Sequence, residues 1–246
     1  MITEDRIEHI KEWIADYALN IEKQPISLVV GISGGIDSAV TSTLCARTNL
    51  NTIVVSMPIK QNKNQHSLSI QHGEWLKYKF KNIVSYTINL DSTFNSFQQA
   101  MKEFKSDLAY ANSRSRLRMV TLYQIAQSNN GIVVGTGNKV EDFGIGFYTK
   151  YGDGGVDISP IADCTKTQVW EMGKKLDILQ NIIDAKPTDG LWEDSRNDED
   201  QIGLSYQQIE EAMNNPKSKY FEKYNKIRQP NLHKMNPIPV CIIKDD

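Results

Sequence analysis

Residues 31–38, with the sequence GISGGIDS, constrain the fold more than any other part of the chain. They follow the apolar run 26–30 and precede a segment with helical spacing, which predicts a strand, a tight glycine turn and a helix start. Adjacent glycines let the backbone approach an anion, to which the helix N-terminus and the hydroxyls of Ser33 and Ser38 would donate. Asp37 would repel a bound phosphate unless a divalent cation lay between them. The segment therefore predicts a site for a nucleotide with Mg²⁺.

This glycine turn differs from the common phosphate loop, because G-x-x-x-x-G-K-[ST] requires a lysine that is absent here. Ser and Asp are also ordinary capping residues where a helix follows a Gly-Gly turn. The pattern SGGxDS resembles the pyrophosphate loop of the ATP pyrophosphatases. In that superfamily the loop binds the β and γ phosphates of ATP, the α phosphate is attacked, and an adenylated substrate results.

Hydrophobic patterning along the chain alternates between strands and helices. Strands are predicted at 26–30, 52–57, 83–88 and 132–134, and helices at 7–17, 65–78, 94–104 and 113–127. The alternation favours a doubly wound α/β fold, a mainly parallel sheet with helices on both faces, and the 246 residues suit a single domain. Because ligands of such sheets bind beyond the carboxyl ends of the strands, one cleft should collect the loops at Gly31, Met57 and Gly135.

Charge and cysteine usage exclude several classes of protein. With 28 Lys and Arg against 30 Asp and Glu, the net charge of −2 gives no field for nucleic acid, so a small-molecule substrate is favoured. Cys45, Cys164 and Cys241 are isolated, which indicates neither disulfides nor a zinc site and suits the cytosol. Without an apolar signal core or a run near ~18 apolar residues, we expect a cytoplasmic protein that does not contact a membrane.

The turn at 135–140, GTGNKV, begins like a dinucleotide-binding fingerprint. Its last position is Val140 rather than glycine, so it is weak support for an NAD-binding oxidoreductase. Glu141 follows directly and could supply a second carboxylate for Mg²⁺ opposite Asp37. A glutamate at such a position is also commonly a solvated acid at a helix start.

Residues 147–157, FYTKYGDGGVD, combine three glycines with two acids, a lysine and three aromatic residues, which excludes a regular helix and indicates a functional loop. The segment closely resembles the FxTKYGDGGxD signature of the NAD synthetases. Other segments resemble motifs of that family in the same order: 112–119 (N-x-x-x-R-x-R-M), 135–141 (ATP loop), 163–169 (D-x-T-K-x-Q-V), 186–192 (P-[ST]-x-x-L-W) and 197–206 (T-D-E-x-x-[LI] region).

The resemblance covers about residues 5–235 and implies the ATP-dependent amidation of deamido-NAD. In this reaction the nicotinate carboxylate attacks the α phosphate, ammonia opens the acyl-adenylate, and NAD, AMP and pyrophosphate result. The family also implies a homodimer. Glutamine-dependent relatives carry an additional amidohydrolase domain for which this chain has no room, so we expect free ammonia as the nitrogen donor. A separately encoded glutaminase partner is the alternative source of the ammonia.

The resemblance further implies roles for single residues. Asp37 and Glu141 would bind Mg²⁺, while Ser33 and Lys166 would act on the phosphates during catalysis. Asp153 is our candidate for removing a proton from ammonium, because the cationic form cannot attack. The residues expected to bind ATP are Gly31, Ile32, Ser33, Gly34, Gly35, Ile36, Asp37, Ser38, Met57, Thr136, Lys166 and Thr188. Those expected to bind deamido-NAD are Arg116, Lys150, Asp157, His233 and Lys234.

Near its C-terminus the sequence departs from the family, because the family's H-K-R is here His233-Lys234-Met235. A His-Lys pair at such a place is commonly solvated surface, and the tail 236–246 has no feature that assigns it a role. Residues 184–203 are rich in Asp, Glu, Asn and Gly, and we expect them to form a mobile lid that orders over ATP.

Two apolar stripes suit a dimer interface, although either could equally face the chain's own sheet. They comprise Ile7, Ile10, Trp13, Ile14 and Tyr17 in the first helix and Leu117, Val120, Tyr123 and Ile125 in a later one. The alternative functions that share the SGGIDS loop are a GMP synthetase subunit, a tRNA thiolase and a nucleotide-binding sensor without turnover. The first two would lack the 147–157 loop, and the sensor would not need Asp37, Glu141 and Lys166.

Overall fold

The computed structural model describes residues 1–21, 27–60, 63–188 and 197–243. At its centre lies a parallel sheet with the strand order β3-β2-β1-β4. The strands are β1 (Ser27–Gly31), β2 (Asn51–Ser56), β3 (Ile83–Thr87) and β4 (Gly131–Val134). The apolar runs predicted each strand to within one residue at either end, and the expected doubly wound α/β fold is confirmed.

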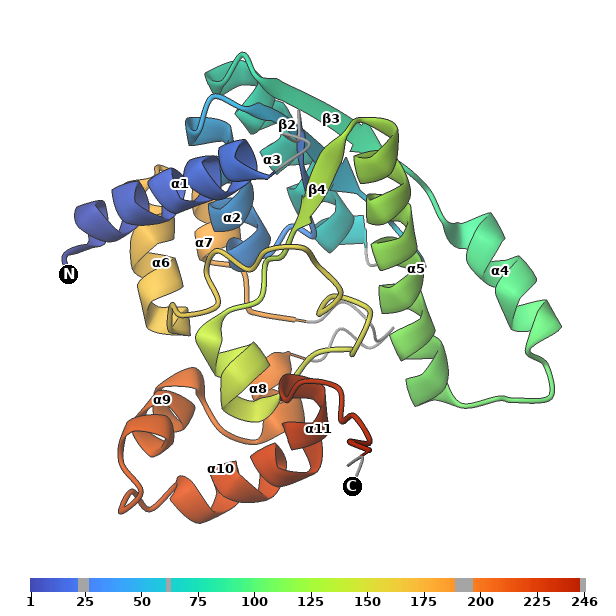
Figure 1. The fold of residues 1–246 in the computed structure, drawn as a ribbon, viewed down its shortest axis with the longest axis vertical. Coiled ribbons are helices and arrows are strands. Elements are labelled where there is room, and N and C mark those ends of the chain that lie inside the picture. Colours follow the sequence, from blue (N-terminus) through green and yellow to red (C-terminus); the bar gives the residue numbers. More distant parts are fainter. Residues whose placement is uncertain (22–26, 61–62, 189–196, 244–246) are drawn as a thin grey trace.

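Helices cover both faces of the sheet (Figure 1). On one face α2 and α3 pack against the strands, with α1 and α6 against α2, and on the other face α5 packs against β1 and β4, with α4 beside it. The helices of these layers are α1 (Thr3–Asn20), α2 (Ile36–Arg47), α3 (Lys63–Lys79), α4 (Asp91–Ala100), α5 (Asp107–Ser128), α6 (Lys166–Lys175) and α7 (Gln180–Ile183).

Strand β1 shows why the strands read as nearly continuous apolar runs. Leu28 and Val30 enter the core that α1, α2 and α6 share, while Val29 enters the core beneath α5. All three side chains are buried. Because successive side chains of a strand point to opposite faces, a strand covered on both faces must be apolar at every position.

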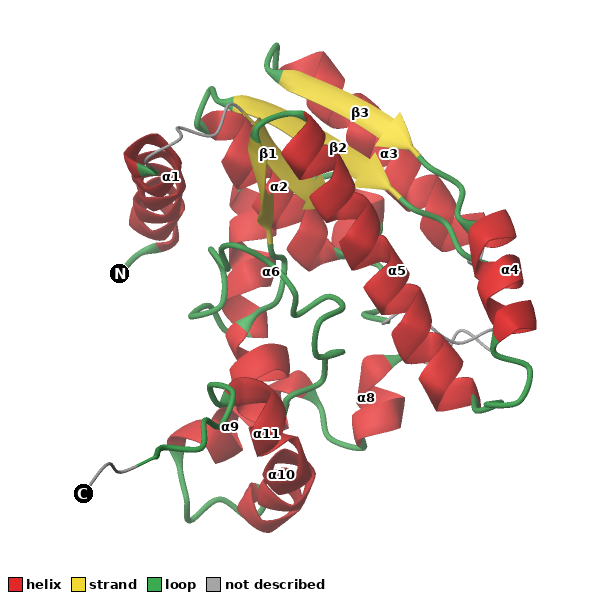
Figure 2. Cartoon of the chain, turned by 45° about the vertical axis from the view of Figure 1, so that its right-hand side comes forward, coloured by secondary structure: helices red, strands yellow, loops and turns green. Residues whose placement is uncertain are grey.

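The connections create a crevice at the carboxyl ends of β1 and β4. The chain runs through β1, β2 and β3 in one direction (Figure 2) and then returns through α4 and α5 to place β4 on the other side of β1. The loops that leave β1 and β4 therefore diverge, and this reversal of strand order is where ligands of open α/β sheets bind. The glycine turn 31–38 follows β1, and residues 135–138 follow β4.

The C-terminal helices lie beyond the carboxyl ends of the strands (Figure 1). They are α8 (Asp198–Ile202), α9 (Tyr206–Asn214), α10 (Phe221–Arg228), the short η2 (Gln229–Asn231) and α11 (Leu232–Met235). Their apolar side chains form a separate core with Val140 and Ile145 of the π-helix η1 (Lys139–Ile145). This second core packs η1 against α9 and α10.

The two apolar stripes mostly face the chain's own core. In α1, Ile7, Ile10 and Ile14 are buried against α2 and α6, whereas Trp13 and Tyr17 are 41% and 42% exposed. In α5, Leu117, Tyr123 and Ile125 pack partly buried against the sheet, whereas Val120 is 56% exposed. The α5 stripe thus mostly faces the chain's own sheet, whereas the α1 stripe mostly faces helices α2 and α6 of the same chain.

Of the expected lid, 184–188 and 197–203 are described and include α8, while 189–196 lie outside the described residues. The described part of the tail, 236–243, forms no helix or strand and is exposed. Among all described residues, no helix is both long and apolar enough to cross a membrane.

His72 lies buried between α3 and α2, with a neutral imidazole ring. Ser42 Oγ donates to the carbonyl of Ser38, 2.7 Å away, so the hydroxyl oxygen accepts from His72 Nε2 at 2.9 Å. His72 Nδ1 is buried and has no hydrogen-bond partner in the described part of the chain. Burial lowers the pKa of His72 from 6.5 to about 4, because protonation would bury an unpaired N–H and a charge.

We expect the free energy of unfolding to fall as the pH drops from 6.5 to about 4. In this window His72 is protonated in the unfolded chain but stays neutral in the folded chain. The free energy of unfolding therefore falls by up to about 3 kcal/mol. Urea unfolding of the wild type and of His72→Gln, measured at several pH values, checks this. The variant should show a smaller slope between these pH values, and His9→Gln, at an exposed site on α1, should keep the wild-type slope. Equal slopes for wild type and His72→Gln would contradict the prediction.

Candidate functional site

A cavity of about 800 Å³ opens at the carboxyl ends of the strands. It is lined by residues 31–38 after β1, by Met57 after β2 and by Gly135 and Thr136 after β4, so the predicted meeting of three loops in one cleft is confirmed. Helix α5, the 146–156 loop and α6 complete its wall. A volume of this size is typical of nucleotide and cofactor sites.

The glycine turn is already ordered by its own hydroxyl groups. Ser33 Oγ accepts from the N–H of Gly35 at 3.2 Å, and Ser38 Oγ accepts from the N–H of Ser33 at 3.2 Å. Gly34 has a φ of 90°, a left-handed conformation that favours glycine. Helix α2 begins at Ile36 directly after the turn, so its N-terminal N–H groups and positive dipole end face the cavity. The geometry suits an anion.

Glu141 is carried by the π-helix η1, which the sequence analysis did not predict. The side-chain Oδ1 of Asn138 caps this helix by accepting from the N–H groups of Val140 and Glu141 at 3.0 and 3.1 Å. Asn is a favoured N-cap residue, so the asparagine before the apolar position was the available signal for a helix start. Short π-helical segments are rare and concentrate at functional sites, where the wider turn redirects a side chain.

Lys166 brings the two predicted metal ligands together. Its Nζ donates to Asp37 Oδ2 at 2.5 Å and to Glu141 Oε1 at 2.9 Å, and the lysine side chain is 2% exposed. Lys166 is the first residue of α6, whose start is fixed by a reciprocal capping box between Thr165 and Gln168. Three helices from distant parts of the sequence, α2, η1 and α6, thus place an ammonium between two carboxylates.

Charge pairing dominates the protonation of Lys166 and Glu141, whereas burial raises the pKa of Asp37 above its ordinary value. Burial opposes the charge on Lys166, but the attraction of Asp37 and Glu141 holds its pKa above the ordinary value, so the lysine stays protonated. Burial also disfavours a charged Glu141, but the ammonium and its hydrogen bond lower the pKa of this carboxyl. The site therefore holds charged groups of both signs in the free protein.

Tyr206 of α9 also donates to Glu141, and the sequence analysis gave this residue no role. Its hydroxyl donates to Glu141 Oε1 at 2.6 Å and lies 3.2 Å from Asp198 Oδ2 of α8. The ring is 1% exposed and packs edge-on against Trp170 at 5.9 Å. A buried tyrosine normally places its hydroxyl on a polar partner, but sequence alone does not say which.

Asp153 occupies a separate corner of the cavity. Its Oδ1 accepts from Ser115 Oγ at 2.6 Å and from the N–H of Thr149 at 3.0 Å, and its own N–H donates to Ser115 Oγ at 2.9 Å. A Cβ on Gly152 would lie 2.3 Å from Ser115 Oγ, so only glycine allows this close approach. Burial raises the pKa of Asp153 above its ordinary value, which suits a group that accepts a proton.

Asp142 is a further acid of the cavity that the sequence analysis missed. Its carboxylate lies over Gly137, where an added Cβ would come within 1.9 Å of Oδ2. Burial, and then the charge of Asp153, raise the pKa of Asp142 well above its ordinary value. This corner of the cavity therefore favours the neutral, protonated form of Asp142.

The donor set fits Mg²⁺ bound together with phosphate. In the described part of the chain no three His, Cys, Asp or Glu side chains gather as a protein-only metal site. Mg²⁺ is usually bound by one or two carboxylates plus phosphate oxygens and water. Because one ammonium contacts both Asp37 and Glu141, the two carboxylates are close enough to share a cation. They would hold the ion on one side and leave its other positions to phosphate.

The predicted site residues fall into two groups. Those that line the cavity are residues 31–38, Met57, Thr136, Glu141, Asp153, Lys166, Thr188 and Lys234. Lys234 Nζ also donates to the carbonyls of Gly146 and Tyr148 at 2.7 and 2.9 Å.

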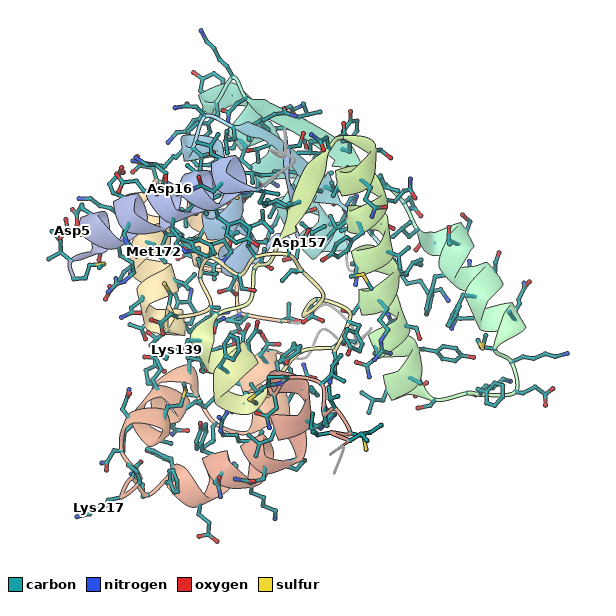
Figure 3. The ribbon with its side chains drawn as sticks, viewed as in Figure 1. Asp5, Asp16, Lys139, Asp157, Met172 and Lys217 are labelled. Carbon is teal, nitrogen blue, oxygen red and sulfur yellow. The ribbon has the colours of Figure 1, made fainter. Side chains whose placement is uncertain are left out.

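Four residues expected to bind the dinucleotide do not line this cavity. Arg116 donates a hydrogen bond to the carbonyl of Lys150, and Lys150 Nζ donates one to the carbonyl of His233. His233 itself is exposed. Asp157 lies between β4 and α5, where Tyr123 and the N–H of Val133 donate to it (Figure 3). Their roles stay predictions.

The chain is similar to known proteins in both sequence and structure. The model of the NAD synthase family matches residues 6–238. The NH(3)-dependent NAD(+) synthetase of Alkaliphilus metalliredigens is 37% identical over 214 residues, 85% of each chain. The solved structure of NMN synthetase from Francisella tularensis superposes with a TM-score of 0.91 at 33% identity, covering 99% of this chain and 100% of that one. The NH3-dependent NAD synthetase of Campylobacter jejuni shares the fold, with a TM-score of 0.79 at 24% identity, and the coverage is 98% of this chain and 100% of that chain.

Proposed function

The chain belongs to the NAD synthase family, and from this premise we propose that it catalyses the ATP-dependent amidation of deamido-NAD by ammonia to NAD. One observation carries the proposal. The anion-binding glycine turn, the Asp37–Lys166–Glu141 cluster and the carboxylate of Asp153 open into the same cavity. An adenylating amide ligase needs these three parts: a phosphate site, a site for cationic charge, and a base near the acyl group.

In the first half-reaction the nicotinate carboxylate attacks the α phosphate of ATP. The glycine turn, with Ser33 and Ser38, would bind the departing pyrophosphate through its N–H groups and hydroxyls. Lys166 would neutralise charge that develops on the phosphates. No protein nucleophile is needed, because catalysis rests on positioning and on charge stabilisation.

Mg²⁺ is the metal we propose for this site, with Asp37 and Glu141 as its protein ligands. When bound, the ion would neutralise phosphate charge and orient the β and γ phosphates. Two uncharged side chains orient these carboxylates: Asn138 Nδ2 donates to Asp37 Oδ1 at 3.2 Å, and the Tyr206 hydroxyl donates to Glu141. Such supporting residues commonly affect metal affinity strongly.

We expect Tyr206→Phe to raise the Mg²⁺ concentration for half-maximal activity by about 10-fold, because Glu141 loses the hydroxyl that orients it. The KM for ATP at saturating Mg²⁺ should stay close to wild type. Tyr224→Phe is the matched control, since Tyr224 lies in the same apolar core but in α10. An unchanged Mg²⁺ dependence in Tyr206→Phe would contradict this role.

In the second half-reaction ammonia opens the acyl-adenylate. Ammonium is the dominant form at neutral pH and has no lone pair, so a carboxylate that accepts its proton is required. We propose Asp153 for this step, since Ser115 and Thr149 hold one of its oxygens in place. AMP leaves, and the amide of NAD remains.

Release of pyrophosphate tests the proposed activity. The purified protein should release pyrophosphate from ATP at a rate that depends on deamido-NAD and should form NAD only when ammonium is also present. Rapid pyrophosphate release without any nicotinate substrate would refute a ligase. Formation of NAD with glutamine as the only nitrogen source would refute free ammonia as the nitrogen source.

Amidation of nicotinate mononucleotide is a second candidate. The chain matches the Francisella NMN synthetase over nearly its whole length at a TM-score of 0.91. In addition, Arg116, Lys150, Asp157 and His233, which we expected to bind the dinucleotide, do not line the cavity of the single chain. Both observations favour a substrate without the adenylyl half. The values of kcat/KM for the two substrates, measured side by side, decide between them.

We propose that the protein is a homodimer in which the partner supplies part of the substrate site. The exposed Trp13, Tyr17 and Val120 could be covered by a second chain, and the substrate contacts outside the cavity could be completed by it. Sedimentation at micromolar and nanomolar concentration, run beside activity, checks this prediction. We expect activity to be lost in step with dissociation, and a fully active monomer would rule out a shared site.

A further inference from the structure

In the free protein, the position between Asp37 and Glu141 is filled by the ammonium of Lys166. The distances are 2.5 Å to Asp37 Oδ2 and 2.9 Å to Glu141 Oε1, and the lysine is 2% exposed. These are the two carboxylates that would hold a divalent ion. The ammonium thus occupies the oxygens that a metal needs.

The two carboxylates are also held by donors that do not depend on the lysine. Asn138 Nδ2 donates to Asp37 Oδ1 at 3.2 Å, and the Tyr206 hydroxyl donates to Glu141 Oε1 at 2.6 Å. Both donors are uncharged, and both belong to elements fixed by packing, since Asn138 and Tyr206 are buried. The pair of carboxylates would therefore keep its arrangement if the ammonium left.

Metal and ammonium cannot share this site at low cost. A divalent ion placed on the same oxygens would contact the lysine's positive charge in a mostly buried environment, where repulsion is weakly screened. Lys166, however, lines the same cavity as residues 31–38, where the phosphates are expected. Its flexible four-carbon stem allows the ammonium to move from carboxylate to phosphate.

We propose that the Lys166 ammonium is the cation that occupies the Asp37–Glu141 site in the free protein. A divalent metal enters only when a nucleoside triphosphate draws this ammonium onto its phosphates. The consequence is an order of binding, because the free protein has low affinity for Mg²⁺ and the nucleotide makes the metal site. This inference rests on the proposed function only for the identity of the anion. It does not depend on which nicotinate compound is the substrate.

Binding of Mn²⁺ alone, followed by electron paramagnetic resonance without any nucleotide, tests the proposal. Wild-type protein should bind Mn²⁺ weakly, and Lys166→Met should bind it at least about 10-fold more tightly, because a like charge has been removed at contact distance. The double variant Lys166→Met/Glu141→Gln should lose this gain. Lys175→Met is the control, because Lys175 lies at the other end of the helix that begins with Lys166 and forms an exposed ion pair with Glu4 of α1. This variant should bind Mn²⁺ as the wild type does. Equal Mn²⁺ affinity in wild type and Lys166→Met would overturn the proposal.

A second measurement on the wild type covers the case in which Lys166→Met does not fold. The side-chain resonance of Lys166 in protein labelled at lysine, identified by its absence in Lys166→Arg, reports on the ammonium directly. It should stay in place when Mg²⁺ is added alone and should shift when α,β-methylene ATP is added without metal. A shift with Mg²⁺ alone would overturn the inference while leaving the proposed amidation intact. A failed amidation assay, in contrast, would leave both binding results unaffected.

Discussion

Replacing Asp37 by Asn is expected to lower turnover at saturating Mg²⁺ by about 100-fold, the usual cost of one lost electrostatic contact to a reacting phosphate. The variant keeps the size of the side chain and an oxygen that can accept from Asn138, 3.2 Å away in the wild type. It removes the negative charge that pairs with Lys166, and it turns an amide N–H group toward the ammonium. The metal would then be held by Glu141 alone. The loss should therefore arise from misplaced charge and not from a changed shape.

Steady-state turnover and melting temperature, measured together, check this prediction. Asp177→Asn is the matched control, because Asp177 is exposed, lies 3.8 Å from Lys79, and has a φ of 56° that Asn tolerates. This variant should retain wild-type turnover. Activity of Asp37→Asn within a few-fold of wild type would show that Asp37 is not a metal ligand. If the melting temperature of Asp37→Asn is strongly lowered, nucleotide binding by this variant is measured as well. Binding should persist because the glycine turn is intact.

The central strands β1 and β2 could be predicted from the sequence because they are covered on both faces. Leu28, Val29 and Val30 are all apolar for that reason, and the glycines after them mark where the strand must turn. The order of the strands, however, depends on how the crossover helices pack on the sheet. The hydrophobic pattern of the sequence does not specify this order. The reversal of strand order between β1 and β4 therefore appears only in the structure.

The site was predictable where a short motif carries its own chemistry. The turn 31–38 and the acids Asp37 and Glu141 were found in this way, and all of them line the cavity. The ion pair of Lys166 with Asp37 was not, because it joins residues 129 positions apart. It depends on α6 beginning at Lys166, opposite the start of α2.

Two structural features of the site had only weak signals. The π-helix η1 has no distinct hydrophobic period, so residues 135–141 read as a turn that ends in an acid. Tyr206 belongs to a segment that resembled the family, yet its contact with Glu141 joins residues 65 positions apart. In both cases tertiary packing of the C-terminal core, through Val140 and Ile145, decides the geometry.

Asp153→Asn is expected to separate the two half-reactions. Asparagine keeps the oxygen that accepts from Ser115 and Thr149, so the loop should retain its shape, but it cannot take a proton from ammonium. Amide formation should fall by about 100-fold or more, the range for loss of a general base. Substrate-dependent exchange of pyrophosphate into ATP, which reports adenylation alone, should stay within a few-fold of wild type. Equal losses in both assays would show that Asp153 only supports the fold of the site.

The pH dependence gives this variant a second signature. Burial raises the pKa of Asp153, so wild-type amidation should be lost on acidification at a pH above the ordinary range for Asp, as the carboxylate gains a proton. Asp153→Asn should lack this acidic limb, and its residual rate should rise with pH as more free ammonia becomes available. Ser115→Ala should move the limb to higher pH, because the Ser115 hydrogen bond lowers the pKa of Asp153. An acidic limb that stays in place in both variants would assign the proton transfer to another group.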